Sequence, residues 1–188
     1  MGNFYVNYTV RGSSPTTVAA ILAGRSAVVT SAQPNTIVVF DKESDEQSED
    51  VIANLACRLS HDLSCPVLAV LNHDDDILWY RLYAKGEVLD DYNSTPGYFE
   101  PSAEPSAPSG GDAKKLCETF GASSVAEVED ILRKSSFDEG GYPFAVNRHS
   151  DLVAALGLPD FAVGYGYANL SNGELPDGLT EDDIIKVS

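Results

Sequence analysis

Several short segments of this chain alternate between apolar and polar side chains, the pattern typical of β-strands. In residues 4–10, Phe4, Val6, Tyr8 and Val10 fall on one face of such a strand. Further segments rich in β-branched and aromatic residues are 27–30, 36–40, 67–71, 77–83 and 88–92. The pattern therefore predicts a sheet built from the first half of the chain.

Two segments between these strands repeat apolar residues at helical spacing. Ser14 and Pro15 supply an N-cap and a first-turn proline for a helix that ends at Gly24. The second helix spans about 51–63, with its start at Ser44 or Ser48. The resulting order β-α-β-β-α-β is that of a ferredoxin-like split βαβ unit with strands appended. An antiparallel sheet with two helices on one face fits the pattern equally well.

The composition changes at residues 94–111, which are dense in Pro, Ser, Ala and Gly and predict an extended connector. We expect Tyr98 and Phe99 to attach the start of this connector to the sheet. After it the helical spacing returns, with ends predicted at Gly121 and Gly157. The expected N-termini are Asp112, a capping box of Ser124 with Glu127, and either Asn147 or Ser150. Residues 159–170 could form helix or strand, and Thr180 starts a final acidic turn.

The sequence thus predicts an α+β protein in three parts. Residues 1–93 form an antiparallel sheet lobe, either ferredoxin-like or an extended split βαβ. Residues 94–111 are the connector, and residues 112–188 form a small, mainly helical lobe. Whether the two lobes pack as one domain is left open.

Charge narrows the classes of partner. Among 188 residues, Lys and Arg number 12 and Asp and Glu number 29, which gives a net charge of −17. A field of this sign repels nucleic-acid backbones and anionic lipid heads, so we expect neither nucleic acid nor membrane as a partner. The same field attracts a basic protein, although acidic surfaces also serve solubility alone. The oligomeric state is not specified by the sequence.

The three cysteines, Cys57, Cys65 and Cys117, form no CxxC pair and are odd in number. This usage fits a reducing compartment better than a disulfide framework. The N-terminal segment MGNFYVNYTV has no basic region followed by an apolar run, and no apolar stretch approaches the ~18 residues of a membrane span. We therefore expect a cytoplasmic location.

A polar cluster, His73-Asp74-Asp75-Asp76, follows the strand at 67–71. Imidazole and carboxylates are ligands for divalent cations and can act as acids and bases, so His73, Asp74 and Asp76 are candidate metal ligands. Asp90 and Asp91 on a neighbouring strand would be helpers. However, adjacent residues in a tight turn fan outward, and Asp is a common turn residue. The pattern favours a turn over a metal site.

The strand at 77–83 has two unlike faces. Leu78, Tyr80 and Leu82 should face the core. The opposite face carries Trp79, Arg81 and Tyr83, residue types that are enriched in interface hot spots. This second face is either a binding surface or the seat of the helical lobe, and we expect the helical lobe to cover it.

Two strings, DDDILWYRLYAKGEVLDDYNSTPGYFE and RHSDLVAALGLPDFAVGYGYANLSNGELP, resemble a group of uncharacterised bacterial proteins. The resemblance extends over about half of the chain. It implies a bacterial origin, and it brings no activity, cofactor or functional residue.

The chain has no G-x-S-x-G elbow, and His61 and His149 fit structural or surface roles. We therefore favour a non-enzymatic, acidic protein-binding module of an immunity or antitoxin-like kind that binds a basic protein. The candidate binding residues are Trp79, Arg81, Tyr83, Asp74, Asp75, Asp76, Asp90 and Asp91. One alternative is a small metal-dependent hydrolase using His73 and its Asp neighbours, and the other is a structural module without a ligand. We expect no cofactor.

Overall fold

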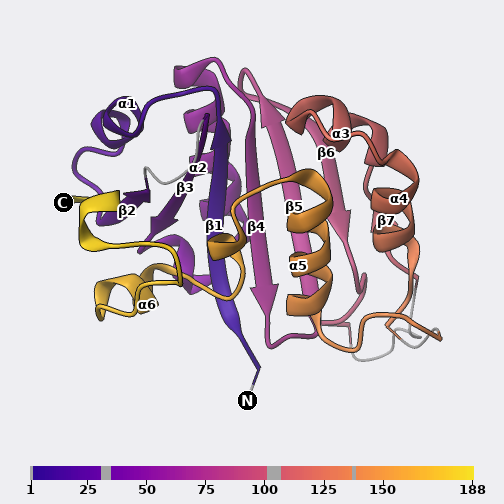
Figure 1. Ribbon diagram of the computed structural model, residues 1–188. Helices are drawn as coiled ribbons and strands as arrows, with labels where there is room; N and C mark the ends of the chain where they lie inside the picture. The colour runs from indigo at the N-terminus through magenta and orange to yellow at the C-terminus, as the bar shows by residue number, and fades with distance from the viewer. Residues whose placement is uncertain (1, 31–34, 101–106, 137–138) are drawn as a thin grey trace.

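The centre of the molecule is a set of strands joined by two helical crossovers (Figure 1). We describe residues 2–30, 35–100, 107–136 and 139–188 of a computed structural model. The elements of the first half are β1 (Phe4–Arg11), α1 (Pro15–Ile21), β2 (Ala27–Thr30), β3 (Thr36–Asp41), the 3₁₀ turn η1 (Ser44–Glu46), α2 (Glu49–Leu63) and β4 (Val67–His73). Their strands pair antiparallel in the order β4-β1-β3-β2, the arrangement of a ferredoxin-like unit. The predicted α+β class is confirmed.

Further strands extend this unit on both sides. On one side, β5 (Ile77–Ala84) and β6 (Glu87–Asn93) continue the sheet as hairpins, and the short β7 (Ser109–Gly110) pairs with the end of β6. On the other side, β8 (Ile184–Val187) pairs with β2. Within the described residues the sheet has the order β7-β6-β5-β4-β1-β3-β2-β8. The sequence missed β8, which follows the acidic turn predicted to start at Thr180.

The remaining helices lie in the C-terminal part of the chain. They are α3 (Ala113–Phe120), α4 (Val125–Arg133), α5 (Ala145–Leu156), α6 (Tyr167–Ser171) and the 3₁₀ turns η2 (Asp160–Ala162) and η3 (Glu181–Asp183). Residues 159–170 thus contain helical turns rather than a strand. No helix in the described ranges is both long enough and apolar enough to cross a membrane.

Two predicted helix N-termini carry the expected side-chain cap, and three do not. Ser14 accepts a hydrogen bond from the backbone N–H of Thr17, and Asp112 accepts one from that of Lys115. Helix α2 begins after Ser48, one of the two predicted starts, but Ser48 makes no side-chain cap bond. Ser124 precedes α4 without a side-chain cap bond, so the predicted capping box is wrong.

Helix α5 also starts earlier than predicted, at Ala145 rather than at Asn147 or Ser150. Its first N–H is satisfied from outside the helix, because Ala145 N donates to the backbone oxygen of Asp75 at 2.6 Å. A distant backbone group thus replaces the local cap that the sequence suggested.

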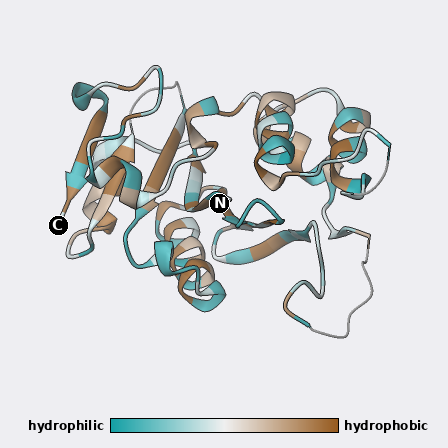
Figure 2. Ribbon diagram, turned by 90° about the horizontal axis from the view of Figure 1, so that it is seen from below, coloured by the Kyte–Doolittle hydropathy of each residue, from teal (hydrophilic) through white to brown (hydrophobic). Residues whose placement is uncertain are grey.

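Both faces of the sheet are apolar, and helices cover both (Figure 2). On one face, α1 and α2 pack against the strand side chains that lie on the same side of the sheet as Val6, Leu71 and Trp79. On the other face, α3, α4 and α5 pack on Leu78, Tyr80 and Leu82. A third cluster joins η2 and α6 to Val28 and Phe40. The C-terminal helices therefore share a hydrophobic core with the sheet. They do not form a clearly separate lobe.

This arrangement corrects one expectation. Residues 112–188 do not cover the face of Trp79 and Tyr83, which instead packs against α2. They cover the opposite, Leu78–Tyr80–Leu82 face, which is buried as predicted. Both faces of β5 are largely apolar, so alternation alone could not assign either face to a particular helix.

A buried arginine fixes α5 against α4. The Arg148 side chain is 1% exposed, and its guanidinium donates to the backbone oxygens of Ile131 and Lys134 at the C-terminal end of α4. It also lies over the ring of Tyr142, at 4.6 Å from the ring centroid. Burial lowers the pKa of Arg148 from its usual range. A cation at a helix C-terminus satisfies free carbonyls and opposes the negative end of the helix dipole.

The packing of the C-terminal helices on β5 predicts a contrast between two leucines. Leu82 is 0% exposed beneath the helices, whereas Leu89 on β6 is 37% exposed. We expect Leu82→Ala to lower the free energy of unfolding by about 2–5 kcal/mol, because it leaves a cavity. Leu89→Ala should cost less than about 1 kcal/mol. Urea unfolding measures both free-energy changes, provided that the m-values of the two variants are equal. Equal losses of stability in the two variants would contradict the packing.

Candidate functional site

A cleft opens on the face of the sheet that α2 covers, at the end where that helix begins. Its volume is about 580 Å³. Its floor is formed by Leu71, His73, Ile77 and Trp79 of β4 and β5. The remaining lining residues are Phe4, Asp45, Glu46, Gln47, Glu49, Asn93, Thr95, Gly97, Tyr98, Phe99 and Glu100. The cleft therefore lies between the start of α2 and the segment that follows β6.

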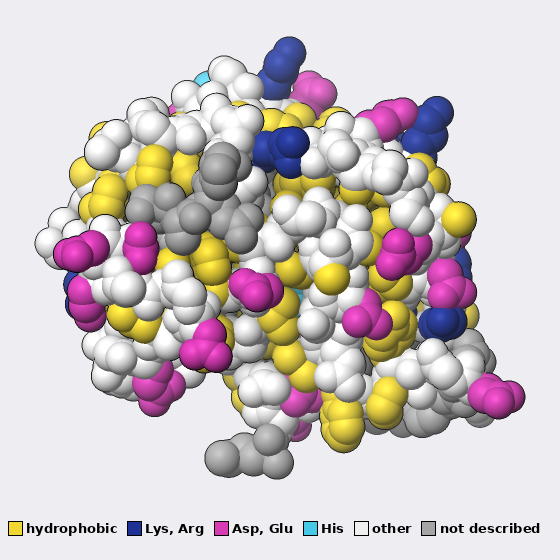
Figure 3. All heavy atoms as spheres, in the orientation of Figure 1, with side chains coloured by type: hydrophobic (Ala, Val, Ile, Leu, Met, Phe, Trp, Pro, Cys, Tyr) yellow, Lys and Arg dark blue, Asp and Glu magenta, His cyan; other side chains and the backbone are white. Residues whose placement is uncertain are grey.

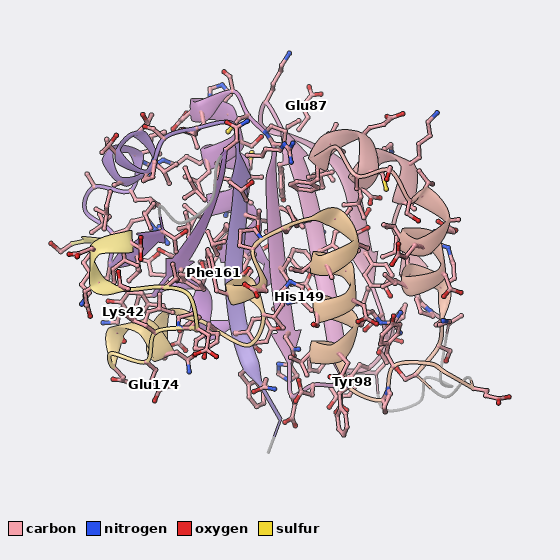
Figure 4. All side chains as sticks on the ribbon, in the orientation of Figure 1. Lys42, Glu87, Tyr98, His149, Phe161 and Glu174 are labelled. Atoms are coloured by element: carbon pink, nitrogen blue, oxygen red, sulfur yellow. The ribbon has the colours of Figure 1, made fainter. Side chains whose placement is uncertain are left out.

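Four rings meet at this cleft, and we call them the aromatic cluster: Phe4, His73, Tyr98 and Phe99. The His73 ring centroid lies 5.0 Å from that of Phe4, 5.1 Å from that of Phe99 and 6.1 Å from that of Tyr98, all edge to face. Phe99 is 70% exposed and Phe4 is 53% exposed. Tyr98, labelled in Figure 4, lies at the lower end of the molecule. Exposed rings gathered beside a cleft are typical of binding sites.

Tyr98 and Phe99 also hold the start of the connector, as predicted. The hydroxyl of Tyr98 donates to Oδ2 of Asp76 at 2.8 Å, and Thr95 Oγ1 donates to the backbone oxygen of Asp76. The hydrogen bond to Asp76 raises the pKa of Tyr98. Residues 101–106 of the connector lie outside the described residues.

Carboxylates surround the aromatic cluster. The acidic lining residues are Asp45, Glu46, Glu49 and Glu100, and the described lining includes no Lys or Arg. Asp45 is engaged, because it accepts hydrogen bonds from the backbone N–H groups of Tyr167 and Ala168 at the start of α6. Burial raises the pKa of Asp45. Glu46, Glu49 and Glu100 are exposed, so their charges face solvent at the cleft.

Acidic side chains are spread over the molecular surface beyond the cleft. On the face drawn in Figure 3, Asp and Glu are scattered widely, and Lys and Arg lie mostly towards the margins. At the cleft, the first turn of α2 carries Glu49 and Asp50. These carboxylates neutralise the positive end of the helix dipole, which could otherwise attract an anion. The local field at the cleft therefore favours a cation.

A short hydrogen-bond chain fixes the His73 ring. Gln47 Nε2 donates to the backbone oxygen of Asn72 at 2.8 Å, and Gln47 Oε1 lies 2.6 Å from Nδ1 of His73. Gln47 has a φ of 59°, a left-handed conformation that is uncommon for a residue other than glycine. This conformation directs the amide to both partners, so η1 positions the ring on the floor of the cleft.

The three aspartates after His73 form a tight turn, as the sequence favoured. Asp74 and Asp75 have φ values of 53° and 60°, and Asp76 N donates to the His73 backbone oxygen at 3.0 Å. The carboxylates fan out to separate partners. Asp74 accepts from Gly2 N, Asp75 from Asn3 N and Asp76 from the Tyr98 hydroxyl. Among the residues that the structure describes, no three His, Cys, Asp or Glu side chains are grouped to hold a metal ion.

Asp90 and Asp91 lie away from this turn. They pair with Leu82 and Arg81 of β5, whereas His73 pairs with Ile77 at the start of that strand. Asp90 Oδ2 accepts from the Tyr80 hydroxyl at 2.8 Å and from Asp112 N at 2.9 Å. Burial raises the pKa of Tyr80. Asp90 thus helps to hold the start of α3 against the sheet, and the structure does not bring it to the predicted metal ligands.

The predicted surface of Trp79, Arg81 and Tyr83 is only partly accessible. Trp79 is 5% exposed and Tyr83 is 3% exposed, and the Arg81 guanidinium lies 5.1 Å from the Trp79 ring centroid. Of these three residues, only Trp79 lines the cleft. Their role in binding stays a prediction.

Cleft residues that the sequence did not single out include Phe4, Gln47 and Glu100. They come from segments far apart in the chain, and only the tertiary fold brings them together. Phe4 gave a weak signal. It is an aromatic residue at the start of an alternating strand, and no predicted helix would cover it.

A second polar group lies on the opposite face of the sheet. His149 on α5 is 2% exposed, and its Nδ1 lies 2.8 Å from the hydroxyl of Tyr5 (Figure 4). The two rings stack at a centroid distance of 5.7 Å. Burial lowers the pKa of His149 to about 3 and raises that of Tyr5. Both groups are therefore neutral near pH 7, and the pair joins α5 to β1 as a structural contact.

Comparison of the chain with family models, curated proteins and solved structures finds no match. The cleft itself therefore carries the functional argument. It combines aromatic ring faces, carboxylates and one imidazole, and this chemistry suits a cationic, partly apolar ligand.

The buried His149 predicts a specific pH dependence of stability. Its pKa is about 3 in the folded protein against 6.5 for the free side chain, so the unfolded chain binds the extra proton first. Stability must therefore fall as the pH drops from about 6.5, by up to about 1.4 kcal/mol per pH unit.

The matched variant is His149→Asn, which keeps a polar atom near the position of Nδ1. The free energy of unfolding, measured in urea between pH 7 and 5, should change less with pH for this variant than for the native chain. Parallel slopes would contradict the neutral, buried state of His149.

Proposed function

We propose that this protein is a non-enzymatic binding module whose cleft takes a basic segment of a partner protein. One observation carries the proposal: the cleft joins exposed aromatic rings to carboxylates, with no Lys or Arg among its described lining residues. Cations are attracted both to the faces of aromatic rings and to carboxylates. Arg81 over Trp79, at 5.1 Å, is an internal example of this contact on the same face of the sheet.

The overall charge supports the same conclusion. With a net charge of −17, the protein attracts basic partners over a distance and speeds their association at low salt. The cleft then supplies the local contacts, since about 580 Å³ lies within the range of pockets that hold a ligand of moderate size. Long-range charge would thus speed the encounter with a partner, and the aromatic cluster would bind its basic segment.

The proposal includes a biological role of the immunity or antitoxin-like kind. A small acidic protein can neutralise a basic toxin or effector domain by covering its cationic surface. The resemblance to bacterial proteins supports a bacterial source, and the free cysteines fit a reducing cytoplasm.

The two alternatives have less support. A metal-dependent hydrolase would need carboxylates that converge near His73, and Asp74, Asp75 and Asp76 instead accept hydrogen bonds from three separate groups. A structural module without a ligand gives no reason for Phe4 and Phe99 to be exposed beside a cleft.

The test uses a fluorescent eight-residue peptide in which Lys alternates with Gly, and a matched peptide in which Glu replaces Lys. We expect the Lys peptide alone to bind, and to bind more weakly as salt rises from 50 to 300 mM. Phe99→Ala should weaken binding by about 2–5-fold, equivalent to a cation–π contribution of about 0.5–1 kcal/mol at an exposed site. Fluorescence anisotropy measures each affinity.

The matched control is Val125→Ala, which also removes an exposed apolar side chain, 41% exposed, but on α4. Its affinity should equal that of the native protein. Absence of binding, or equal losses in the two variants, would count against the cleft as the site.

A further inference from the structure

We infer that His73 selects the ligand: it accepts a hydrogen bond from a cation that carries N–H groups, such as the ammonium of Lys or the guanidinium of Arg. This inference rests on the proposed function and names the chemistry of its ligand. It excludes quaternary ammonium groups as the preferred occupant, although aromatic sites elsewhere often take them.

The hydrogen bonds of Gln47 determine which nitrogen of His73 carries the proton. The backbone oxygen of Asn72 can only accept, so the Gln47 atom beside it must be the amide nitrogen, Nε2. The other amide atom, Oε1, can only accept, and it lies 2.6 Å from His73 Nδ1. Nδ1 must therefore donate. In the neutral imidazole, the lone pair is then on Nε2.

The Nε2 atom is the free acceptor of the ring. Among the described residues, none donates a hydrogen bond to it, and the Phe4 and Phe99 rings meet the imidazole with nonpolar atoms. Since Gln47 holds the opposite side of the ring, Nε2 is the polar atom that His73 can offer to a ligand in the cleft.

The other polar side chains of the lining are already engaged. The Tyr98 hydroxyl donates to Asp76, Thr95 Oγ1 donates to the Asp76 backbone, and Asn93 Oδ1 accepts from Thr95 N. The exposed carboxylates of Glu46, Glu49 and Glu100 attract every cation by charge, as do the ring faces. Among the neutral side-chain acceptors of the described lining, His73 Nε2 is thus the one whose atom makes no hydrogen bond within the protein.

A polar site discriminates most strongly against a ligand that leaves its hydrogen-bonding group unpaired. Trimethylation of Lys keeps the charge and removes every N–H. We therefore expect the Lys–Gly peptide to bind about 3–10-fold more tightly than the same peptide with Nε-trimethyllysine at each Lys position. Anisotropy titrations at pH 8 give the ratio of the two affinities.

His73→Phe tests the assignment to this residue. It keeps a ring in the cluster and removes the acceptor, so the ratio of the two affinities should fall to about 1. A native ratio of 1 or below, or an unchanged ratio in the variant, would overturn the role of His73. If neither peptide binds the native protein, the proposed function itself fails.

The ratio measured on the native protein tests the inference even if His73→Phe does not fold, because a native ratio of 1 or below already contradicts it.

Discussion

The need to cover two apolar faces of one sheet determines the whole architecture. In β4, all residues from Val67 to Leu71 are buried, so both sides of the central strands require helices. The crossovers of the ferredoxin-like unit place α1 and α2 on one side. A unit of this size leaves its other face bare, and the C-terminal helices α3, α4 and α5 complete it. Because removal of either layer would expose a broad apolar surface, the two halves of the chain depend on each other for stability.

The cleft is a local consequence of the same constraint. Helix α2 covers its face as far as Glu49, yet the β4–β5 hairpin continues past the helix to His73 and the turn. The segment after β6 reaches this uncovered end through Tyr98 and Phe99, without filling it. Aromatic rings therefore remain partly exposed where a helix would otherwise have buried them. The concentration of carboxylates at the same end gives this gap in the core a polarity suited to a basic ligand.

The sequence predicted those features that depend on local pattern. Alternation assigned Leu78, Tyr80 and Leu82 to one face of β5, and the glycine at 121 marked the end of α3 correctly. The pattern could not specify which helix covers which face, since the bulky side chains of Trp79 and Tyr83 suit a core as well as the leucines opposite them. It missed β8 because this strand forms by pairing with the distant β2 and follows directly on an acidic turn. It missed the cleft because the contributing residues meet only in the tertiary structure.

The turn after β4 shows how the structure redistributes roles within one motif. From the sequence, the carboxylates of Asp74, Asp75 and Asp76 were the natural ligands, and His73 was one partner among them. In the fold, these carboxylates accept hydrogen bonds from the N-terminal segment and from Tyr98, so they stabilise the end of the hairpin. A hairpin end held in this way gives His73 a fixed backbone, and Gln47 fixes its ring. Under the proposed function, the aspartates would contribute to recognition indirectly, because their hydrogen bonds hold the turn that carries His73.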